Sequence, residues 1–488
     1  MKINDYNLSL LCDFYELTMS RGYFNTPMRD RIAYFDVFYR KVPDGGGYAI
    51  AAGLEQIVRY VEDLHFTDED IDFLRGKRIF DEPFLAYLRG FRFTGDIWAV
   101  PEGTVIFPHE PILTVRAPII EAQLVETYLL LCLNHQCLIA TKASRMVRAA
   151  KGRPISEFGS RRAHGEDAAV SGARAAYIGG CASTACTLSD RLFGVPASGT
   201  MAHSWVQMFD NEYEAFTTYA RLYPENPCFL VDTYSVFGSG LPNAVRAVKD
   251  VLWPMGKKKC AIRIDSGDLA YITKKARKVL DEEGLTDCKI VVSNSIDEYL
   301  INDLLAQEAQ IDAFGIGERL ITAKSDSVFG CVYKLAAVED GAGHVIPKIK
   351  VSENAAKITN PGFKRVWRFY ANDSGKAEAD LIAMRDEPDI DQDKPCEIFD
   401  PEFTWKRKVL TDFTVRELLV PVFLGGKLVY NLPPLAEIRD HCEREMNTMW
   451  KEVLRFENPR DYYVDLSEKL WTVKNAMISR YIKGNHDE

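Results

Sequence analysis

The sequence lacks a long apolar run and an excess of positive charge, and each absence excludes a class of protein. The longest apolar stretch, residues 127–140, is interrupted by Asn134 and His135 and is too short to cross a bilayer. The formal net charge of -10 offers no electrostatic footprint for nucleic acid or an anionic membrane. The one basic run, residues 257–259, is short and is typical of a solvated loop. We therefore expect neither a nucleic-acid partner nor a membrane partner.

The cysteines form no Cys-x-x-Cys motif, so the close ligand pairs of a structural zinc site are missing. Cys132 with Cys137, and Cys181 with Cys186, lie in Ala- or Leu-rich surroundings that are typical of buried, reduced thiols. Residues 1–20 carry three acidic side chains and do not resemble a signal peptide. These features predict a reduced, cytoplasmic protein.

The chain is too long for one hydrophobic core, because its 488 residues exceed the usual size of a single domain. Its first part mixes helix and strand. Residues 32–39 alternate like a half-buried strand, and residues 95–115 indicate a small antiparallel region. A long helix is predicted over residues 121–151, and further helices over 440–450 and 466–482.

Between residues 155 and 317, short apolar runs are each followed at once by a polar or Gly-containing cluster. Predicted helices separate these runs, and such alternation favours a parallel sheet with crossover helices. No Gly-x-Gly-x-x-Gly follows the first strand, so the dinucleotide-binding fingerprint is missing. We predict an α/β fold: an N-terminal mixed α/β domain (1–120), an irregular (β/α) barrel with the active site (121–340) and a C-terminal α+β domain (341–488). The six clusters begin at Ile155, Gly199, Phe229, Ile262, Ile290 and Phe314, and the helices cover 167–179, 212–221, 241–251, 269–283 and 298–307.

Polar residues at the ends of buried strands are how a (β/α) barrel builds an active site. His203 could be a general base, a metal ligand or a phosphoryl acceptor, or simply a hydrogen-bonded structural histidine. Strand alternation places Arg263 and Asp265 on one face, where they need each other or a ligand. Asp268 directly precedes an apolar helix and is best explained as its N-cap.

Two further clusters point to phosphate and to a flat ligand. Phe158 could stack on a planar group, and one of the adjacent Arg161 and Arg162 could capture phosphate. Gly315 and Gly317 form a Gly-rich turn, which could bind phosphate through backbone amides or simply be a tight turn. The residues alone indicate a barrel enzyme for a phosphorylated small molecule, and leave group transfer, isomerisation and aldol chemistry open.

Together the clusters resemble the nicotinate phosphoribosyltransferases, of the type II phosphoribosyltransferase family. The resemblance implies that nicotinate, phosphoribosyl pyrophosphate and ATP give nicotinate mononucleotide, pyrophosphate, ADP and phosphate, in NAD salvage. It also implies Mg²⁺ beside the pyrophosphate, with no ligands assigned, and a homodimer with shared active sites. Six motifs carry it: residues 13–19 (DFYELTM), 157–162 (EFGSRR), 199–204 (GTMAHS), 232–235 (DTYS), 264–269 (IDSGDL), and 315–317 (GIG) with 332–335 (VYKL).

The resemblance also assigns roles to individual residues. His203 would be phosphorylated by ATP, and Asp265 would stabilise charge developing on the ribose. Nicotinate would contact Thr200 and Arg263, stack on Phe158, and be covered by Tyr15 of the other subunit. In addition, Arg161 would bind pyrophosphate or phosphate, and Gly315 and Gly317 would hold the ribose phosphate.

Two positions depart from the patterns of related enzymes. Many relatives have threonine where this chain has Glu318, a carboxylate that would repel phosphate unless it turned away. Nicotinamide-specific relatives carry an aspartate where Met201 stands here, and its absence favours the nicotinate anion. The alternatives are a nicotinamide- or quinolinate-specific enzyme, a catalytically silent nucleotide-binding homologue, and an unrelated barrel aldolase or isomerase.

Overall fold

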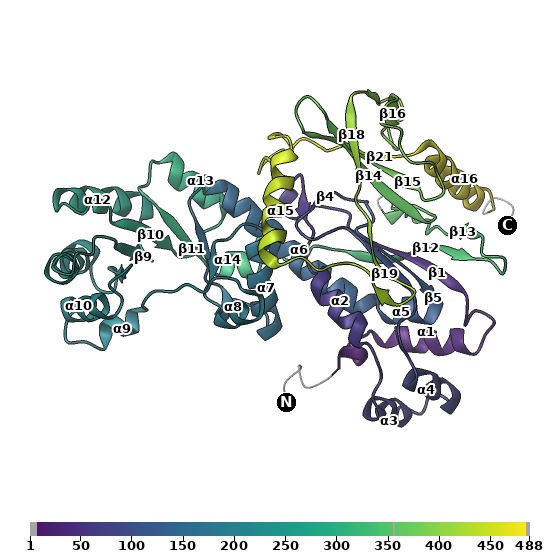
Figure 1. Cartoon of the computed structure of the whole chain (residues 1–488), viewed down its shortest axis with the longest axis horizontal. Helices are drawn as coiled ribbons and strands as arrows, with labels where there is room; N and C mark the ends of the chain where they lie inside the picture. The colour runs from purple at the N-terminus through teal and green to yellow at the C-terminus, as the bar shows by residue number, and fades with distance from the viewer. Residues whose placement is uncertain (1–6, 355–356, 485–488) are drawn as a thin grey trace. The chain divides into compact units, whose positions relative to one another are not determined.

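The computed structural model describes residues 7–354 and 357–484 and divides the chain into two compact units (Figure 1). Unit 1 combines residues 1–138 with 328–488, and unit 2 comprises residues 139–327. Unit 1 is therefore assembled from the two ends of the chain, whereas unit 2 is continuous. The division into domains at residues 120 and 340 stays a prediction.

A seven-stranded antiparallel sheet forms the framework of unit 1, with the order β13-β12-β1-β5-β3-β19-β20. The predicted strand at 32–39 belongs to it, as do β3 and β5 of the predicted antiparallel region at 95–115. Strands from the two ends of the chain thus pair directly. The bounds are β1 (Ile32–Phe38), β3 (Asp96–Ala99), β5 (Leu113–Pro118), β12 (Val332–Glu339), β13 (Val345–Pro347), β19 (Val420–Leu424) and β20 (Lys427–Leu428).

Strand β1 is buried along both faces, so the prediction of a half-buried strand was wrong. Strands β12 and β5 pair with its two edges. The polar Asp36 is tolerated there because Lys364 Nζ lies 2.7 Å from its carboxylate and Thr114 Oγ1 donates to it at 2.8 Å. Buried charge is accepted when it is paired in this way.

The remainder of unit 1 contains smaller sheets and helices. A four-stranded sheet has the order β18-β14-β15-β21, and two strand pairs, β16-β17 and β2-β4, complete the set. The two predicted C-terminal helices are present as α15 and α16. The bounds are β2 (Ala49–Ile50), β4 (Val105–Ile106), β14 (Lys364–Ala371), β15 (Ala377–Met384), β16 (Cys396–Phe399), β17 (Arg407–Leu410), β18 (Phe413–Glu417), β21 (Val464–Leu466), α1 (Phe14–Phe24), α2 (Leu54–Asp63), α3 (Asp68–Gly76), α4 (Glu82–Arg89), α5 (Ile119–Leu124), α15 (Leu435–Thr448) and α16 (Glu468–Gly484).

Unit 2 is built on a six-stranded, all-parallel sheet with the order β7-β6-β11-β10-β9-β8. In Figure 1 its helices are arranged around these strands. The five predicted helices are all present. The bounds are β6 (Ile155–Glu157), β7 (Ser183–Thr184), β8 (Cys228–Leu230), β9 (Ala261–Ile264), β10 (Lys289–Ser293), β11 (Ala313–Ile316), α7 (Glu166–Ile178), α8 (Thr187–Phe193), α9 (His203–Gln207), α10 (Glu212–Leu222), α11 (Leu241–Ala247), α12 (Leu269–Glu282), α13 (Glu298–Ala306) and α14 (Glu318–Ile321).

Five of the six predicted strands are present, and the sixth was wrong. The cluster at Gly199 does not follow a strand, because residues 198–202 form a loop that leads into α9. The sixth strand is β7, whose two residues are Ser183 and Thr184. A strand this short and polar has no apolar pattern by which the sequence could reveal it.

The long helix predicted over residues 121–151 is present as α5 followed by α6 (Glu126–Ala149). This stretch, 119–149, is long and apolar enough to cross a membrane by length and composition. In its most apolar window, 61% is buried inside the protein, as is typical of a core helix. The cysteines, which are all free and mostly buried, agree with the prediction of reduced thiols.

The buried pair Asp36–Lys364 gives a first prediction, for Lys364→Met. Removal of the cation leaves a buried carboxylate unpaired, and we expect the free energy of unfolding to fall by about 3–5 kcal/mol. Urea unfolding of the full chain measures it. The double variant Asp36→Asn/Lys364→Met removes both charges and should recover part of the loss. A decrease below about 1 kcal/mol in the single variant would contradict the importance of the pair.

Candidate active site

The carboxyl ends of the parallel strands in unit 2 lie along one edge of the sheet, and most of the predicted site residues follow them. The exceptions in unit 2 are His203, the first residue of α9, and Thr200, which lies in the loop before it. His203 Nδ1 lies 3.1 Å from Thr233 Oγ1, just beyond the end of β8. Because Thr233 engages Nδ1, Nε2 is the ring nitrogen left for a reaction.

Thr200 and Arg263 come together although 63 residues separate them. Arg263 Nη1 donates to Thr200 Oγ1 at 2.6 Å. Within the described part of the chain, the buried Nε of Arg263 has no hydrogen-bond partner. Arg263 and Asp265 do not pair with each other in the described ranges, so the alternative of a structural ion pair is not realised. A cation held by a neutral hydroxyl retains its attraction for an anion.

Asp265 takes part in a polar network that joins the ends of β8, β9 and β10. Its carboxylate accepts a hydrogen bond from Ser293 Oγ, and its backbone N–H donates to Asp232 Oδ2 at 2.9 Å. Ser266 Oγ donates to the same Asp232 oxygen at 2.6 Å. The other oxygen, Asp232 Oδ1, is buried with no hydrogen-bond partner among residues 7–354 and 357–484. Asp232 and Asp265 are therefore joined through the Asp265 backbone, and Asp232 has an unused acceptor.

Phe158 and Gly315 are in direct steric contact at the ends of β6 and β11. A methyl group at Gly315 would lie 2.6 Å from a ring carbon of Phe158, so glycine is required here to make room for the ring. The Phe158 backbone N–H donates to the carbonyl of Ile316 at 2.7 Å. The aromatic ring predicted to stack on a flat ligand is thus fixed against the glycine turn.

The remaining predicted positions of unit 2 lie on short turns. Arg161 is exposed on a 3-10 turn that spans Ser160–Arg162, and Gly317 caps α14. The Glu318 carboxylate pairs with Lys324 Nζ at 2.5 Å, and this cation lowers the pKa of Glu318. Its charge is therefore offset by a neighbour. Asp268 is the N-cap of α12 as predicted, since its side chain accepts from Tyr271 N–H at 3.1 Å.

Tyr15 belongs to unit 1 and lies on α1, where its side chain is partly exposed. Burial of the hydroxyl and a hydrogen bond to Glu126 raise the pKa of Tyr15. The phenol is therefore neutral at physiological pH. Its predicted role concerns the site of another subunit and stays a prediction.

Sequence reasoning assigned no specific role to three residues that the structure joins to the site: Asp232, Thr233 and Ser293. All three lie in clusters that the sequence had marked as strand ends, so their place was indicated. The hydrogen-bond partners of these residues were not indicated, because contacts such as His203–Thr233 depend on how segments far apart in the sequence come together. Among the residues that the structure describes, no group of three or more His, Cys, Asp or Glu could hold a metal ion.

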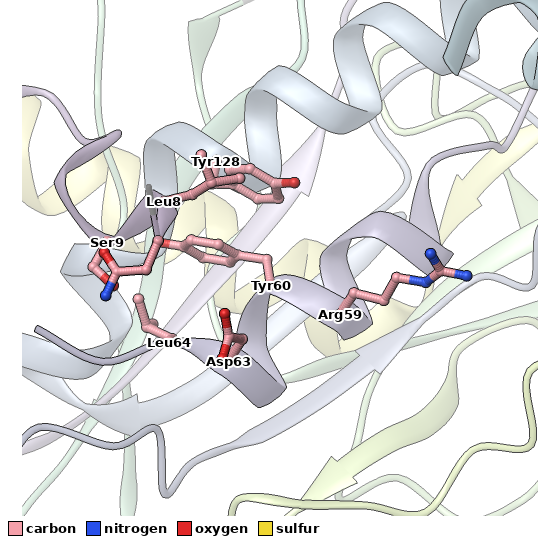
Figure 2. Close-up of a pocket in the computed structure, with 8 residues that line it drawn as sticks. Leu8, Ser9, Arg59, Tyr60, Asp63, Leu64 and Tyr128 are labelled. Carbon is pink, nitrogen blue, oxygen red and sulfur yellow. The ribbon is translucent and has the colours of Figure 1, made fainter. Parts of the chain in front are cut away.

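A pocket of about 240 Å³ in unit 1 has a different character. The rings of Tyr60 and Tyr128 stack beside it with centroids 3.9 Å apart, and Figure 2 shows Arg59 pointing away from them. None of the predicted site residues lines it. The polar strand ends of unit 2 therefore remain the candidate active site.

The chain matches three family models along most of its length. Residues 10–134 match the nicotinate phosphoribosyltransferase N-terminal domain, residues 154–360 the nicotinate phosphoribosyltransferase family, and residues 363–474 the C-terminal domain. The regions that carry the six sequence motifs lie inside these matches.

Relatives and a solved structure agree with the family models. Nicotinate phosphoribosyltransferase of Bacillus subtilis is 42% identical, covering 97% of this chain and 96% of the relative. The enzyme of that name from Mus musculus is 31% identical, covering 96% of this chain and 97% of its own. The crystal structure of human nicotinic acid phosphoribosyltransferase superposes with a TM-score of 0.82 at 29% identity, covering 96% of this chain and 100% of that chain. The chain belongs to the nicotinate phosphoribosyltransferase family.

Proposed function

We propose that this protein transfers the phosphoribosyl group of phosphoribosyl pyrophosphate to nicotinate, giving nicotinate mononucleotide and pyrophosphate. The observation that carries the proposal is the Arg263 guanidinium, which is held by the neutral Thr200 while its buried Nε has no partner in the described ranges. Such a cation suits the carboxylate of nicotinate. Met201 adds no acceptor for the amide of nicotinamide, so the anionic base is favoured.

The pyridine ring would stack on Phe158, whose position against Gly315 is fixed by steric contact. In a homodimer, Tyr15 of the other subunit would cover the second face of the ring. Arg161 and the backbone amides of Gly315 and Gly317 would bind the phosphate groups. The parallel sheet of unit 2, with β7 and β8 at its edges, would curve into an irregular barrel around this site. The enzyme would be cytoplasmic.

Asp265 would lie beside the ribose, where its carboxylate stabilises positive charge that develops as the bond to pyrophosphate breaks. The neighbouring Asp232 Oδ1 and the Asp265 carboxylate fit Mg²⁺, which is commonly held by one or two carboxylates together with substrate phosphates. Bound there, the ion would neutralise charge on the pyrophosphate. Ser293 and Ser266 orient the two carboxyl groups through their hydroxyls.

ATP would take part in the reaction by phosphorylating His203. We propose that Nε2 attacks the γ-phosphorus of ATP, that the bond to ADP breaks, and that phosphohistidine forms. Support comes from the Nδ1–Thr233 contact at 3.1 Å, which leaves Nε2 free. Later hydrolysis of the labile N–P bond releases phosphate and would drive ribosyl transfer toward the mononucleotide.

The first test compares nicotinate, nicotinamide and quinolinate as bases, with phosphoribosyl pyrophosphate and Mg²⁺, in the presence and absence of ATP. We expect kcat/KM for nicotinate to exceed that for nicotinamide by about 100-fold or more, because Arg263 selects an anion. ATP should raise the yield of mononucleotide. Equal rates with nicotinamide would contradict the proposed specificity, and no product from any base would indicate a catalytically silent homologue.

The second test follows phosphate on the protein after incubation with γ-labelled ATP. We expect acid-labile label on the wild type and none on His203→Ala, since the imidazole is the acceptor. His164→Ala, which removes an exposed histidine of the same unit, is the control and should label like the wild type. Equal labelling of His203→Ala and the wild type would show that His203 is not the acceptor.

The third test is Gly315→Ala. The new methyl group would displace the Phe158 ring, and we expect KM for nicotinate to rise about tenfold or more, because small misplacements in a site are costly. Steady-state kinetics with nicotinate measure it. Gly76→Ala is the matched control, since a methyl group there meets no atom within 4 Å. An unchanged KM for nicotinate in Gly315→Ala would contradict the proposed role of the Phe158 ring in binding the base.

A further inference from the structure

Glu157 is a fully buried carboxylate at the end of β6, directly before Phe158. Among the residues that the structure describes, no cation pairs with it, and its side-chain oxygens accept from a backbone amide and a hydroxyl. Burial raises the pKa of Glu157, while its hydrogen bonds with Thr184 and Gly159 lower it. Burial of a carboxyl group without a cationic partner costs free energy. Its presence here therefore indicates a positional requirement that an apolar side chain would not meet.

The first oxygen of Glu157 holds the turn that follows it. Oε1 accepts a hydrogen bond from the Gly159 backbone N–H. The turn between these two residues carries Phe158, and it continues into the 3-10 turn of Arg161. No side chain can be added at Gly159, because a Cβ atom would lie 2.6 Å from Ile321 and 2.7 Å from Glu157 Oε1. The direction in which the Phe158 ring leaves the strand is therefore set by this bond.

The second oxygen of Glu157 reaches across to β7. Oε2 accepts a hydrogen bond from Thr184 Oγ1 at 2.7 Å, and the Glu157 carbonyl accepts from Ala185 N–H at 2.8 Å. Thr184 in turn fixes the next segment through its backbone. Its N–H donates to the Pro196 carbonyl at 3.0 Å, and its carbonyl accepts from Ser198 N–H at 2.8 Å.

Ser198 lies two residues before Thr200, the side chain that holds Arg263. Ser183 Oγ strengthens the same connection, since it lies 2.9 Å from Ser198 Oγ. One carboxylate is thus bonded to the turn that carries the stacking ring and, through Thr184, to the segment that carries the hydroxyl on Arg263. Both segments belong to unit 2, and both would contact nicotinate.

We propose that Glu157 is a positioning residue that sets the distance between the Phe158 ring and the Thr200–Arg263 pair, and so shapes the slot for the base. This inference rests on the proposed function. Glutamine cannot replace Glu157 without loss, because its amide group would take the place of the oxygen that accepts from Thr184 Oγ1, and the hydroxyl proton would lose its acceptor. His203 has its own support in α9 and Thr233, so its phosphorylation should not depend on Glu157.

The test is Glu157→Gln, which keeps the size of the side chain. We expect KM for nicotinate and the dissociation constant of nicotinate, measured by calorimetry, to rise about tenfold, because one donor is left unpaired in the interior. The labelling of His203 by ATP should stay within about twofold. Such a split separates positioning of the base from general damage to the fold.

Thr184 provides a second pair of variants. Thr184→Val removes the hydroxyl and should raise KM for nicotinate by about three- to tenfold, whereas Thr184→Ser keeps it and should restore a value near that of the wild type. In the double variant Glu157→Gln/Thr184→Val the effects on KM for nicotinate should be less than additive, since both changes break the same hydrogen bond between Thr184 and Glu157.

Glu121→Gln is a matched control. Glu121 is a buried carboxylate of unit 1 that also accepts from one backbone N–H and one threonine hydroxyl, both of Thr94, at 2.6 and 2.8 Å. Its substitution should lower the melting temperature without changing KM for nicotinate.

Three outcomes with the variants would overturn the inference. The first is an unchanged KM for nicotinate in Glu157→Gln, and the second is a parallel loss of nicotinate binding and of labelling in that variant, as in a damaged fold. The third is the same rise of KM in Glu121→Gln. A wild type that binds nicotinate without turnover would contradict only the proposed function, and the dissociation constants then decide the role of Glu157. A wild type that does not bind nicotinate overturns both.

Discussion

Parallel pairing of the backbone in unit 2 is the constraint on which the candidate site depends. Six strands run in one direction, so their carboxyl ends meet at one edge, and residues far apart in the sequence become neighbours. The contact between Phe158 and Gly315 arises in this way, and Thr233, beyond the end of β8, meets His203 at the start of α9. No single loop contains a working set of groups. The site exists only because the hydrogen-bonded ladder holds the loops in register.

The electrostatics of the site follow from which charges are paired and which are not. Glu318 is neutralised by Lys324, and Glu157 is satisfied by two neutral donors. Arg263 has a neutral partner in Thr200 and keeps its full positive charge. Asp232 and Asp265 are held by backbone and hydroxyl donors, and they keep their affinity for a cation or for developing positive charge. A region with separate positive and negative sites suits an anionic base at the cation, and a bound cation or developing positive charge at the carboxylates.

Apolar runs made much of the fold of unit 2 predictable, because a buried strand such as β9 or β10 needs such a run before its polar end. The strand β7 was missed, since two polar residues give no pattern, and His203 was placed at a strand end although it begins a helix. The burial of β1 on both faces could not be foreseen, because the cation that pairs with its Asp36 is Lys364, more than 300 residues away. Residue types at the site were predictable from motifs. Their hydrogen-bond partners were not, because partners are set by strand order.

The seven-stranded sheet of unit 1 has a consequence for the growing chain. Strands β1, β5 and β3 are adjacent at its centre, and both of their outer neighbours, β12 and β19, are encoded after unit 2. More than 200 residues separate the end of β5 at Pro118 from the start of β12 at Val332. At a ribosomal rate of roughly 5–20 residues per second, the central strands wait roughly 10 to 40 seconds with two open edges. Unit 2 is continuous in sequence and can form its sheet during that interval. The unit that bears the candidate site is therefore free to fold before the sheet of unit 1 is complete.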